Sequence, residues 1–376
     1  MEKALIVSTN LGFIANFEQN DIRLLQEMGY EVHCAANESL VGNMKNLERL
    51  LKSDITVHDI CFNRNPGSTM NIRAMKALRL LMEKEHFSLV HCHTPVAAAC
   101  TRIALGKYRK RGLKIIYTAH GFHFFKGAPL KNWIMFYPLE KMLSHKTDVI
   151  ITINKEDYER AKKRLFAGKT VYIPGIGIDT ERFGRTYESR KSIREELSIP
   201  QEAKLLISIG ELSVRKNHKV IIEAMARIKT PLYYIEAGKG SLDKTLEEMA
   251  ERLGLSGRVK LLGYRTDIPE LLAASDLFVF PSLQEGLPVA LMEAMASGLP
   301  CVVSRIRGNT DLIETKELMF EPTSVDQAIS SIEYALSNDM HAETERNKEK
   351  IKEFDIIHVS SMMKTIYMET ANNTKS

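Results

Sequence analysis

Two glutamates in the segment PSLQEGLPVALME, residues 281–293, are the residues whose types and spacing most directly suggest chemistry. Glu285 follows the apolar run DLFVF, and Glu293 lies about two helical turns further on. Pro288 fits the first position of a helix, so the amides of Gly286 through Val289 would lie at a helix N-terminus. Such a terminus binds phosphate or sugar hydroxyls, and a nearby carboxylate accepts hydrogen bonds from vicinal hydroxyls. The alternative is a helix-start acid followed by a solvated helical glutamate.

Two basic residues follow another apolar run. In GELSVRKNH, residues 210–218, Arg215 and Lys216 stand where a strand ends and a helix is expected to begin. Their cationic groups could bind a diphosphate, and Asn217 would then cap the helix. Two solvated basic residues are the alternative. The turn AGKGS places Gly238 after a further strand, but it completes neither the G-x-G-x-x-G nor the Walker pattern.

Histidines gather at strand ends in the first half: His91 and His93 in VHCHTP, then His120 and His123 in TAHGFHFF. These side chains could form the sugar and acceptor side of an active site. Zinc is not expected at His91, Cys92 and His93, because alternation along a strand sends neighbours to opposite faces and no C-x-x-C accompanies them. The chain also has no D-x-D pattern, so no divalent metal is expected to hold a diphosphate.

Short apolar runs that alternate with helical periodicity must position these residues. Such alternation predicts parallel, doubly wound sheets, whose ligands bind beyond the carboxyl ends of the strands. The expected strands of the first half are 4–8, 31–36, 88–93, 114–120 and 148–154, with helices that include 16–29 and 44–52. The alternation restarts at 203–210 and continues with strands at 232–238, 258–263, 276–282 and 300–305.

The predicted fold class is therefore α/β, with two Rossmann-like domains facing each other across a cleft. The first domain is expected to span residues 1–178 and to hold the acceptor. The second is expected to span 179–355 and to hold a nucleotide-sugar donor. A C-terminal helix at about 356–376, with apolar residues spaced for one face, is expected to pack back onto the first domain.

Composition narrows the class of protein. The chain has 376 residues with 44% hydrophobic and 26% charged content, typical of a globular enzyme or binding protein of two domains. The five cysteines are odd in number and scattered, which favours a reducing, cytoplasmic location. We expect neither a signal peptide nor a membrane-spanning helix.

Charge is distributed unevenly along the chain. Residues 1–180 carry 26 Lys and Arg against 17 Asp and Glu, whereas the remainder carries 26 against 30. The first half is therefore expected to meet an anionic surface or acceptor.

Four motifs in order resemble the retaining GT-B glycosyltransferases of the Glu-x7-Glu, family 4 type, which assemble bacterial exopolysaccharide, capsule and other lipid-linked glycans. They are TAHG, GIGIDTERF, GYRTDIPELLAASDLFVFPS and QEGLPVALMEAMASGLPCVVS, and the similarity covers nearly the whole chain. The resemblance implies that Glu293 binds the donor ribose, that Glu285 and the amides after it hold the transferred sugar, and that Lys216 binds the diphosphate. His120 would contact the donor sugar, with His93 on the acceptor side.

The same resemblance supplies the remaining site candidates and shows three departures. Further donor-side residues would be Gly12 in the loop after the first strand, Gly286, Leu287, Pro288, Val289, Gly238, Tyr264 and Arg265, while His123 would join the acceptor side. Many relatives have Arg where this chain has Glu211, so Arg215 is expected to supply the missing cation. The loop TNLGF has one glycine where many relatives have two, and Asp311 stands where relatives often have Glu.

The resemblance implies transfer with retention, in which the acceptor attacks the face from which the nucleotide leaves. Double displacement with Glu285 as nucleophile is the alternative. The expected donor is a hexose or N-acetylhexosamine linked to UDP, with GDP still open, and no cofactor or metal is expected. The expected acceptor is a growing glycan linked to polyprenyl pyrophosphate. Two other classes compete: a nicotinamide-dependent oxidoreductase, which should show G-x-G-x-x-G after its first strand, and a non-catalytic nucleotide-sugar-binding module.

Membrane contact at the cytoplasmic face is a further expectation, and no nucleic-acid partner is expected. Six Lys and Arg lie between residues 102 and 114, and the segment GFHFFKGAPLKNWIMFYPLEK mixes aromatic, apolar and basic residues. That mixture is typical of an interfacial surface. A helix packed inside the domain with solvated lysines is the alternative.

Overall fold

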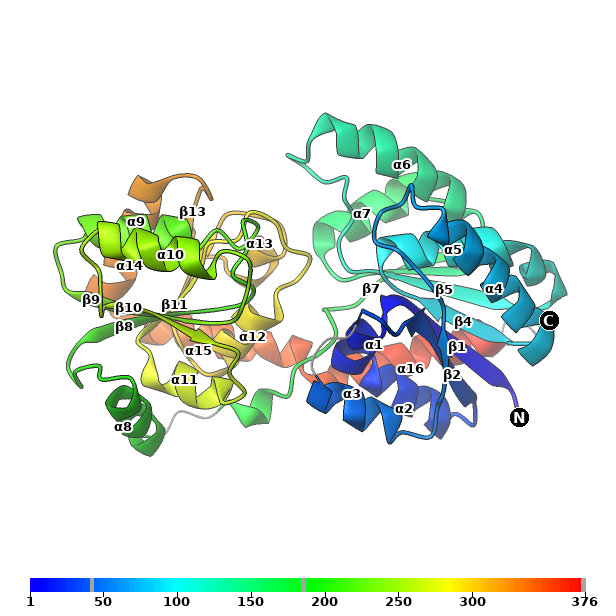
Figure 1. The fold of residues 1–376 in the computed structure, drawn as a ribbon, viewed down its shortest axis with the longest axis horizontal. Helices are drawn as coiled ribbons and strands as arrows, with labels where there is room; N and C mark the ends of the chain where they lie inside the picture. The colour runs from blue at the N-terminus through cyan, green and yellow to red at the C-terminus, as the bar shows by residue number, and fades with distance from the viewer. Residues whose placement is uncertain (41–43, 184–186, 373–376) are drawn as a thin grey trace. The chain divides into compact units, whose positions relative to one another are not determined.

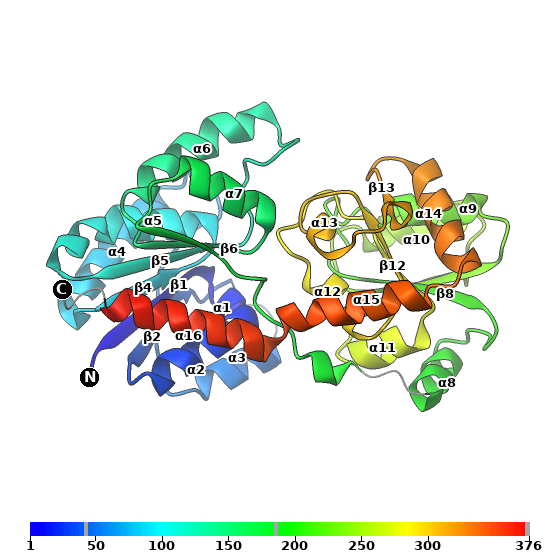
Figure 2. The same ribbon diagram turned by 180° about the vertical axis from the view of Figure 1, so that it is seen from behind.

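The computed structural model describes residues 1–40, 44–183 and 187–372, which form two compact units. Unit 1 comprises residues 1–176 and the chain from 357 onward, and unit 2 comprises residues 177–356. Each unit is a parallel β-sheet covered by helices on both faces (Figures 1 and 2). The fold class is therefore the predicted one, two parallel-sheet α/β domains. The division lies beside the expected boundary at residue 178.

Unit 1 contains a seven-stranded sheet of order β3-β2-β1-β4-β5-β6-β7, parallel throughout. Both faces of a parallel sheet are buried, so its strands are continuous apolar runs whose alternate residues enter opposite cores. In β1, Leu5 and Val7 enter one core, and Ala4 and Ile6 enter the other. The strands are β1 (Lys3–Asn10), β2 (Glu31–Asn37), β3 (Thr56–Asp59), β4 (Leu89–Cys92), β5 (Lys114–Ala119), β6 (Val149–Thr152) and β7 (Lys169–Tyr172).

The helices of unit 1 divide between the two faces of its sheet, as Figure 1 shows. One face packs against α4 (Met70–Glu85), α5 (Pro95–Leu105), α6 (Leu130–Ser144) and α7 (Lys155–Arg164), with the 3-10 turn η1 (Gly106–Arg111) after α5. The other packs against α1 (Leu11–Phe17), α2 (Gln19–Glu27), α3 (Met44–Leu51) and α16 (Ile356–Asn372). The C-terminal helix thus contributes Val359, Met363 and Ile366 to the core of unit 1. Residues 373–376 of the expected helix lie outside the described part of the chain.

Unit 2 contains a six-stranded parallel sheet of order β10-β9-β8-β11-β12-β13. Its strands are β8 (Lys204–Ile209), β9 (Leu232–Ala237), β10 (Val259–Gly263), β11 (Leu277–Phe280), β12 (Cys301–Ser304) and β13 (Met319–Phe320). Its helices are α8 (Tyr187–Glu196), α9 (Lys219–Arg227), α10 (Asp243–Arg252), α11 (Ile268–Ala274), α12 (Val289–Ala296), α13 (Asn309–Leu312), α14 (Val325–Ser337) and α15 (His341–Ile351). Three 3-10 turns complete it: η2 (Thr180–Arg182), η3 (Lys316–Leu318) and η4 (Lys352–Phe354).

Two details differ from the sequence prediction. The strands β3, β7 and β13 were not expected; β3 and β7 are half-exposed edge strands and β13 has two residues, so none forms a long apolar run. The helix expected over 16–29 is two helices, α1 and α2, which meet at Glu18. Glu18 has φ −111° and ψ 6°, outside the helical range, so the chain changes direction there. This break turns out to position a buried carboxyl group.

In both sheets the strand order reverses next to the first strand of the unit. The reversal lies between β1 and β4 in unit 1 and between β8 and β11 in unit 2. Loops leaving two such strands diverge to opposite faces of the sheet, which opens a crevice at their carboxyl ends. These two crevices are where the polar residues singled out by the sequence gather.

Candidate active site

In unit 2, the loops after β8 and β11 bring two cations onto one carboxylate. Nζ of Lys216 lies 2.8 Å from Oε1 of Glu285, and Nη1 of Arg215 donates to the same oxygen at 2.9 Å. Arg215 also donates to the carbonyl of Gln284 at 3.1 Å. The ammonium group of Lys216 lies 4.5 Å from the ring centroid of Phe280, at the end of β11. The structure therefore brings two adjacent predicted site residues, Arg215 and Lys216, onto a third, Glu285, which is about 70 residues away in the sequence.

Two of the three charged side chains in this cluster are largely buried, which strengthens the electrostatic interaction between them. The side chains of Lys216 and Glu285 are 11% and 10% exposed, whereas Arg215 is 45% exposed. Burial lowers the pKa of Lys216, and the attraction of Glu285 opposes that shift. A buried ion pair adds little net stability, but removing one partner leaves an uncompensated charge and costs several kcal/mol. The pair therefore fixes two functional groups at the crevice more than it stabilises the fold.

Close approach between the loops accounts for Gly238. A Cβ atom at Gly238 would lie 1.7 Å from the carbonyl oxygen of Gly210, in the loop after β8. Contacts below 3.0 Å require the backbone to move, so only glycine fits. Gly238 therefore shapes the loop in which Lys216 lies. Around Gly286 a similar contact exists, since a Cβ at Gly308 would lie 2.4 Å from the Gly286 carbonyl oxygen.

The second glutamate lies in α12, as predicted. Glu293 is partly buried, and burial raises its pKa to about 7, with Arg182 of η2 opposing the shift. Pro288 is the N-cap of α12 and not its first residue, because its ψ of 115° is extended. Leu287 and Pro288 are both buried, while Gly286 and Val289 remain partly accessible. The helix start at this loop thus lies one residue later than expected.

Two predicted residues of unit 2, Asn217 and Arg265, make contacts that the prediction did not include. Asn217 does not cap α9; it has φ 57°, and its amide donates to the carbonyls of Pro281 and Pro322 at 3.1 and 2.8 Å. Asn217 therefore ties the loop after β8 to the loop after β11. Arg265 donates to the carboxylate of Glu196 at 2.6 Å and to that of Asp267 at 2.8 Å, so its charge is already compensated. Tyr264 is 57% exposed.

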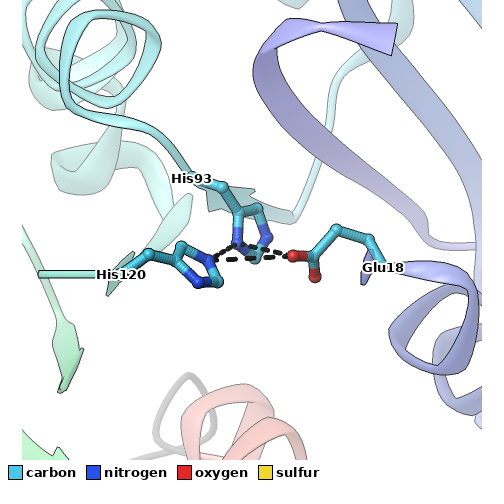
Figure 3. Close-up of side chains that lie close together, drawn as sticks. All are labelled: Glu18, His93 and His120. Atoms are coloured by element: carbon cyan, nitrogen blue, oxygen red, sulfur yellow. Dashed lines mark hydrogen bonds and ion pairs between the residues drawn. The ribbon is translucent and has the colours of Figure 1, made fainter. Parts of the chain in front are cut away.

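In unit 1, Glu18, His93 and His120 form a compact cluster at the crevice (Figure 3). Nδ1 of His93 lies 3.3 Å from Nε2 of His120 and 3.2 Å from Oε1 of Glu18. Oε1 of Glu18 lies 3.8 Å from Nε2 of His120. His93 follows β4 and His120 follows β5, whereas Glu18 comes from the break between α1 and α2. A cavity of about 30 Å³ adjoins the three side chains.

Backbone strain helps to fix His93. The next residue, Thr94, has φ 58° and ψ 139°, a conformation that costs a non-glycine residue about 1–3 kcal/mol. Its hydroxyl accepts a hydrogen bond from the amide of Thr9 at 3.0 Å and lies 2.8 Å from the Thr9 hydroxyl. These bonds join the end of β4 to β1, next to the strand-order reversal. Such outliers cluster at functional sites, where surrounding contacts hold them in place.

A second layer of hydrogen bonds lies behind the cluster. Nδ1 of His91 lies 2.7 Å from the Tyr367 hydroxyl, and Nε2 of His91 lies 2.8 Å from the Thr118 hydroxyl. The Tyr367 hydroxyl in turn donates to Asp21 at 2.9 Å. Tyr367 belongs to α16, so the C-terminal helix completes the polar interior of unit 1.

Burial sets the protonation of these groups. It lowers the pKa of His120 to about 4 and that of His91 to about 3, and it lowers the pKa of His93 well below its usual range. The imidazoles are therefore neutral near pH 7. Burial and then the neighbouring Asp21 raise the pKa of Glu18 well above its usual range, while burial raises the pKa of Asp21 to about 6.

Two further predictions for unit 1 need correction or comment. Gly12 does not lie in a loop; it lies in the first turn of α1, because Asn10 caps that helix by accepting from the amide of Phe13 at 2.7 Å. Leu11 and Ile14 then bury the helix against the sheet. His123 is not part of the cluster, and its ring packs 4.6 Å from that of Phe136 in α6.

The proposed basic and interfacial surface is only partly exposed. Arg102, one of the six basic residues between 102 and 114, is fully buried, bonds to Glu140 and lies 4.1 Å from the ring centroid of Tyr117. Arg109 is bound to Asp148 by two hydrogen bonds of 2.9 Å. By contrast, α6 exposes large apolar side chains: Leu130, Ile134, Met135 and Met142. Among residues 1–40, 44–183 and 187–372, no helix combines the length and apolar character needed to cross a membrane.

Glu18 and Asp21 were not singled out by the sequence prediction. Their carboxyl groups look unremarkable in the polar stretch NFEQND, which lies within the single helix predicted over residues 16–29. The one available signal is that both acids interrupt an apolar pattern next to buried Ile14, Ile22 and Leu25. That signal does not reveal that the side chains meet histidines from two other strands.

Two parallel α/β units, each with a polar cluster where its strand order reverses, form the architecture of the GT-B fold. Family models match both halves: Glycosyltransferase Family 4 over residues 22–182 and Glycosyl transferases group 1 over residues 189–353. The glycosyltransferase EpsD of Bacillus subtilis (strain 168) is 38% identical to this chain over 297 residues. The match covers 78% of this chain and 76% of EpsD. The chain belongs to this family of glycosyltransferases.

Other relatives extend the comparison. The UDP-Gal:alpha-D-GlcNAc-diphosphoundecaprenol alpha-1,3-galactosyltransferase of Escherichia coli is 28% identical over 324 residues, covering 82% of each chain. Among solved structures, HepE (Alr3699) of Anabaena, in complex with UDP and glucose, superposes with a TM-score of 0.80 at 19% identity. That match covers 98% of this chain and all of HepE, and it shows a shared fold. The relatives of this chain include enzymes of bacterial glycan assembly, and the activity class is glycosyl transfer.

Proposed function

We propose that this chain transfers a hexosyl or N-acetylhexosaminyl group, with retention, from a UDP-sugar to a bacterial glycan linked to a polyprenyl pyrophosphate. The observation that carries the proposal is the pair of cations, Lys216 and Arg215, held on Glu285 at the strand-order reversal of unit 2. A diphosphate that entered this crevice would meet two cations already placed side by side. Preorganised charge of this kind stabilises a leaving diphosphate without a reorganisation cost.

Unit 2 would bind the nucleotide. Glu293, in α12, would accept hydrogen bonds from the two ribose hydroxyls, and Gly286 and Val289 remain accessible at the start of that helix. Lys216 and Arg215 carry two positive charges against the one negative charge of Glu285, and this net positive charge would bind the diphosphate without a metal ion. UDP is proposed because the galactosyltransferase relative is named for UDP-Gal and HepE was solved with UDP.

Retention would proceed by attack of the acceptor on the face from which the nucleotide leaves, with the leaving phosphate oxygen taking the acceptor proton. Double displacement requires a free carboxylate nucleophile. Oε1 of Glu285 instead receives hydrogen bonds from two cations, which reduces its nucleophilicity. The geometry therefore favours the first route, in which Glu285 holds the sugar and the cations in place.

Unit 1 would handle the acceptor. His120 would contact the transferred sugar, since its side chain is 22% exposed and its neutral ring can reach a ligand, while His93 is buried behind it. α6 carries exposed apolar side chains together with exposed Lys131 and Lys141, and Lys126 is exposed in the segment before it. This combination suits the cytoplasmic face of an anionic membrane that carries a lipid-linked acceptor.

The decisive experiment is nucleotide-dependent thermal stabilisation followed by a transfer assay. Ligand at 100 times its dissociation constant should stabilise the chain by about 2.7 kcal/mol. UDP should raise the melting temperature more than GDP, ADP or NAD, and Glu293→Ala should abolish the shift. Products from the stabilising UDP-sugar should keep the anomeric configuration of the donor, measured by proton NMR. Stabilisation by NAD alone would indicate an oxidoreductase, and stabilisation without turnover of any sugar nucleotide would indicate a binding module.

Membrane contact has its own test. Co-sedimentation with anionic phospholipid vesicles should fall when Ile134 and Met135 are changed to Ser, because their exposed area would otherwise enter the interface. The matched control is Leu80→Ser, an apolar side chain of α4 that is 68% exposed. Equal loss in both variants would contradict a specific role for α6.

A further inference from the structure

Two buried polar atoms of the histidine cluster lack hydrogen-bond partners within the described residues. They are Oε1 of Glu18 and Nε2 of His93, on side chains that are 3% and 1% exposed. Leaving a buried polar atom unsatisfied costs about 1–3 kcal/mol, so native proteins seldom retain one without a reason. Oε1 of Glu18 points at both imidazoles in Figure 3, although it makes a hydrogen bond to neither. The arrangement has room for a group that would satisfy it.

The spacing of the three inward-facing atoms matches a metal site. A tetrahedral zinc ion, with ligands at about 2.0–2.1 Å, separates its ligand atoms by about 3.3 Å. The separations here are 3.2 Å between Glu18 Oε1 and His93 Nδ1, 3.3 Å between the two histidine nitrogens, and 3.8 Å between Glu18 Oε1 and His120 Nε2. A shift of a few tenths of an ångström in one side chain would make the three distances nearly equal.

We propose that Glu18, His93 and His120 bind one divalent first-row transition ion, for which Zn²⁺ is the best match. Two imidazoles and a carboxylate form the ligand set of many zinc sites that keep a fourth position open. The adjoining cavity of about 30 Å³ exceeds the roughly 10–15 Å³ that one water needs, so water can take that position.

The surroundings also favour a cation. Asp21 adds a second carboxyl group next to Glu18, and neither acid is paired with Lys or Arg in the described part of the chain. A divalent ion would compensate both carboxyl groups at once. The ligand atoms are also held in advance, since His93 is fixed by the strained Thr94 and Glu18 by the break between two helices.

The neighbouring triad of Asp21, His91 and His93 has similar spacing, but its ligand atoms are already hydrogen-bonded to other residues. Both ring nitrogens of His91 are already engaged, by the hydroxyls of Tyr367 and Thr118. An ion there would displace the Tyr367 hydroxyl from both His91 and Asp21. An ion on Glu18, His93 and His120 would replace the single hydrogen bond between the two histidines and would satisfy Oε1 of Glu18. We therefore assign Asp21 and His91 to the outer layer, which orients the ligands, and keep His93 as a ligand.

The site departs from the expectation drawn from sequence, which considered only His91, Cys92 and His93. It concerns unit 1 and leaves the metal-free binding of the diphosphate by unit 2 unchanged. One consequence rests on the proposed function: an ion on Nε2 of His120 would remove that nitrogen from the donor sugar. Zinc should then inhibit transfer reversibly, and a chelator should restore it.

The test measures metal binding directly, on the full chain after removal of any affinity tag. Zn²⁺ uptake is followed by equilibrium dialysis, and Co²⁺ is added as a spectroscopic probe because four-coordinate Co²⁺ absorbs visible light strongly. Wild type should bind one ion and show the four-coordinate spectrum. Glu18→Gln, His93→Gln and His120→Gln should each weaken binding by at least about 100-fold, since even outer residues of metal sites contribute 10–100-fold.

The matched control is His358→Gln, an exposed histidine of α16, which should bind as wild type does. Circular dichroism establishes that each variant is folded, and Zn²⁺ should raise the melting temperature of wild type but not of the three ligand variants. Sub-stoichiometric uptake at micromolar Zn²⁺, or wild-type affinity in Glu18→Gln, would overturn the proposal. Nucleotide stabilisation is measured separately without zinc, so failure of the donor assignment is distinguishable from failure of the metal site.

Discussion

The variant Glu293→Gln should change stability and nucleotide affinity in opposite directions. Burial raises the pKa of Glu293 from 4.5 to about 7 in the folded chain. A pKa difference of one corresponds to 1.36 kcal/mol, so ionising this carboxyl inside the folded chain costs about 3 kcal/mol. Because the pKa of Glu293 is higher in the folded chain than in the unfolded chain, its contribution to the stability of wild type is complete below the unfolded pKa of 4.5. That contribution is lost as the pH rises through 7. At pH 8 the free energy of unfolding of the neutral Gln variant should therefore be up to about 3 kcal/mol higher than that of wild type.

Nucleotide binding should show the opposite effect. The ionised carboxylate would accept hydrogen bonds from ribose hydroxyls, and such bonds to a charged group contribute about 1.5–3 kcal/mol. The Gln variant should thus bind UDP more than about tenfold more weakly at pH 8. Wild-type affinity should fall about tenfold between pH 8 and pH 6, because Glu293 is about nine-tenths protonated at pH 6.

Urea unfolding with and without UDP, at several pH values between 5 and 8, measures both quantities. The Gln variant also corrects for titration of the nucleotide phosphate, since that contribution is common to both proteins. The stability gain of the variant should shrink as pH falls toward 4.5. A variant that is less stable than wild type at pH 8 without UDP would refute the electrostatic reasoning. Equal UDP affinity in the two proteins would refute the ribose assignment.

Three further outcomes are expected. Lys216→Met should reduce sugar transfer by about 10²–10³-fold in a turnover assay, because it removes preorganised charge, and a reduction below tenfold would contradict that role. Gly238→Ala should lower the urea midpoint markedly, because its Cβ would lie 1.7 Å from a carbonyl oxygen, whereas Gly67→Ala, with its nearest contact at 3.6 Å, should change it little. Arg102→Met should destabilise unit 1 by about 3–5 kcal/mol in thermal unfolding by leaving Glu140 buried and unpaired, and adding Glu140→Met should recover most of that loss.

Much of the fold could be predicted because its strands are buried on both faces. Runs such as ALIV in β1 and LFVF in β11 are apolar without interruption, and polar side chains flank them. Lys216 and Glu285 were found on that basis, since the carboxyl ends of parallel strands meet at one edge of a sheet. Edge strands β3 and β7 were missed because all of their residues are partly or fully exposed and their composition does not differ from that of a loop.

The sequence by itself determined two α/β domains, the strand ends that carry chemistry and the glycosyltransferase class, because these follow from local apolar periodicity and from motifs contiguous in the chain. Only the tertiary structure decided which residues share one site. It placed Glu18 between His93 and His120, placed Tyr367 of the last helix on His91, and buried Arg102 with Glu140. Such contacts join residues from different elements, and the burial that shifts their pKa values arises only when those elements pack together.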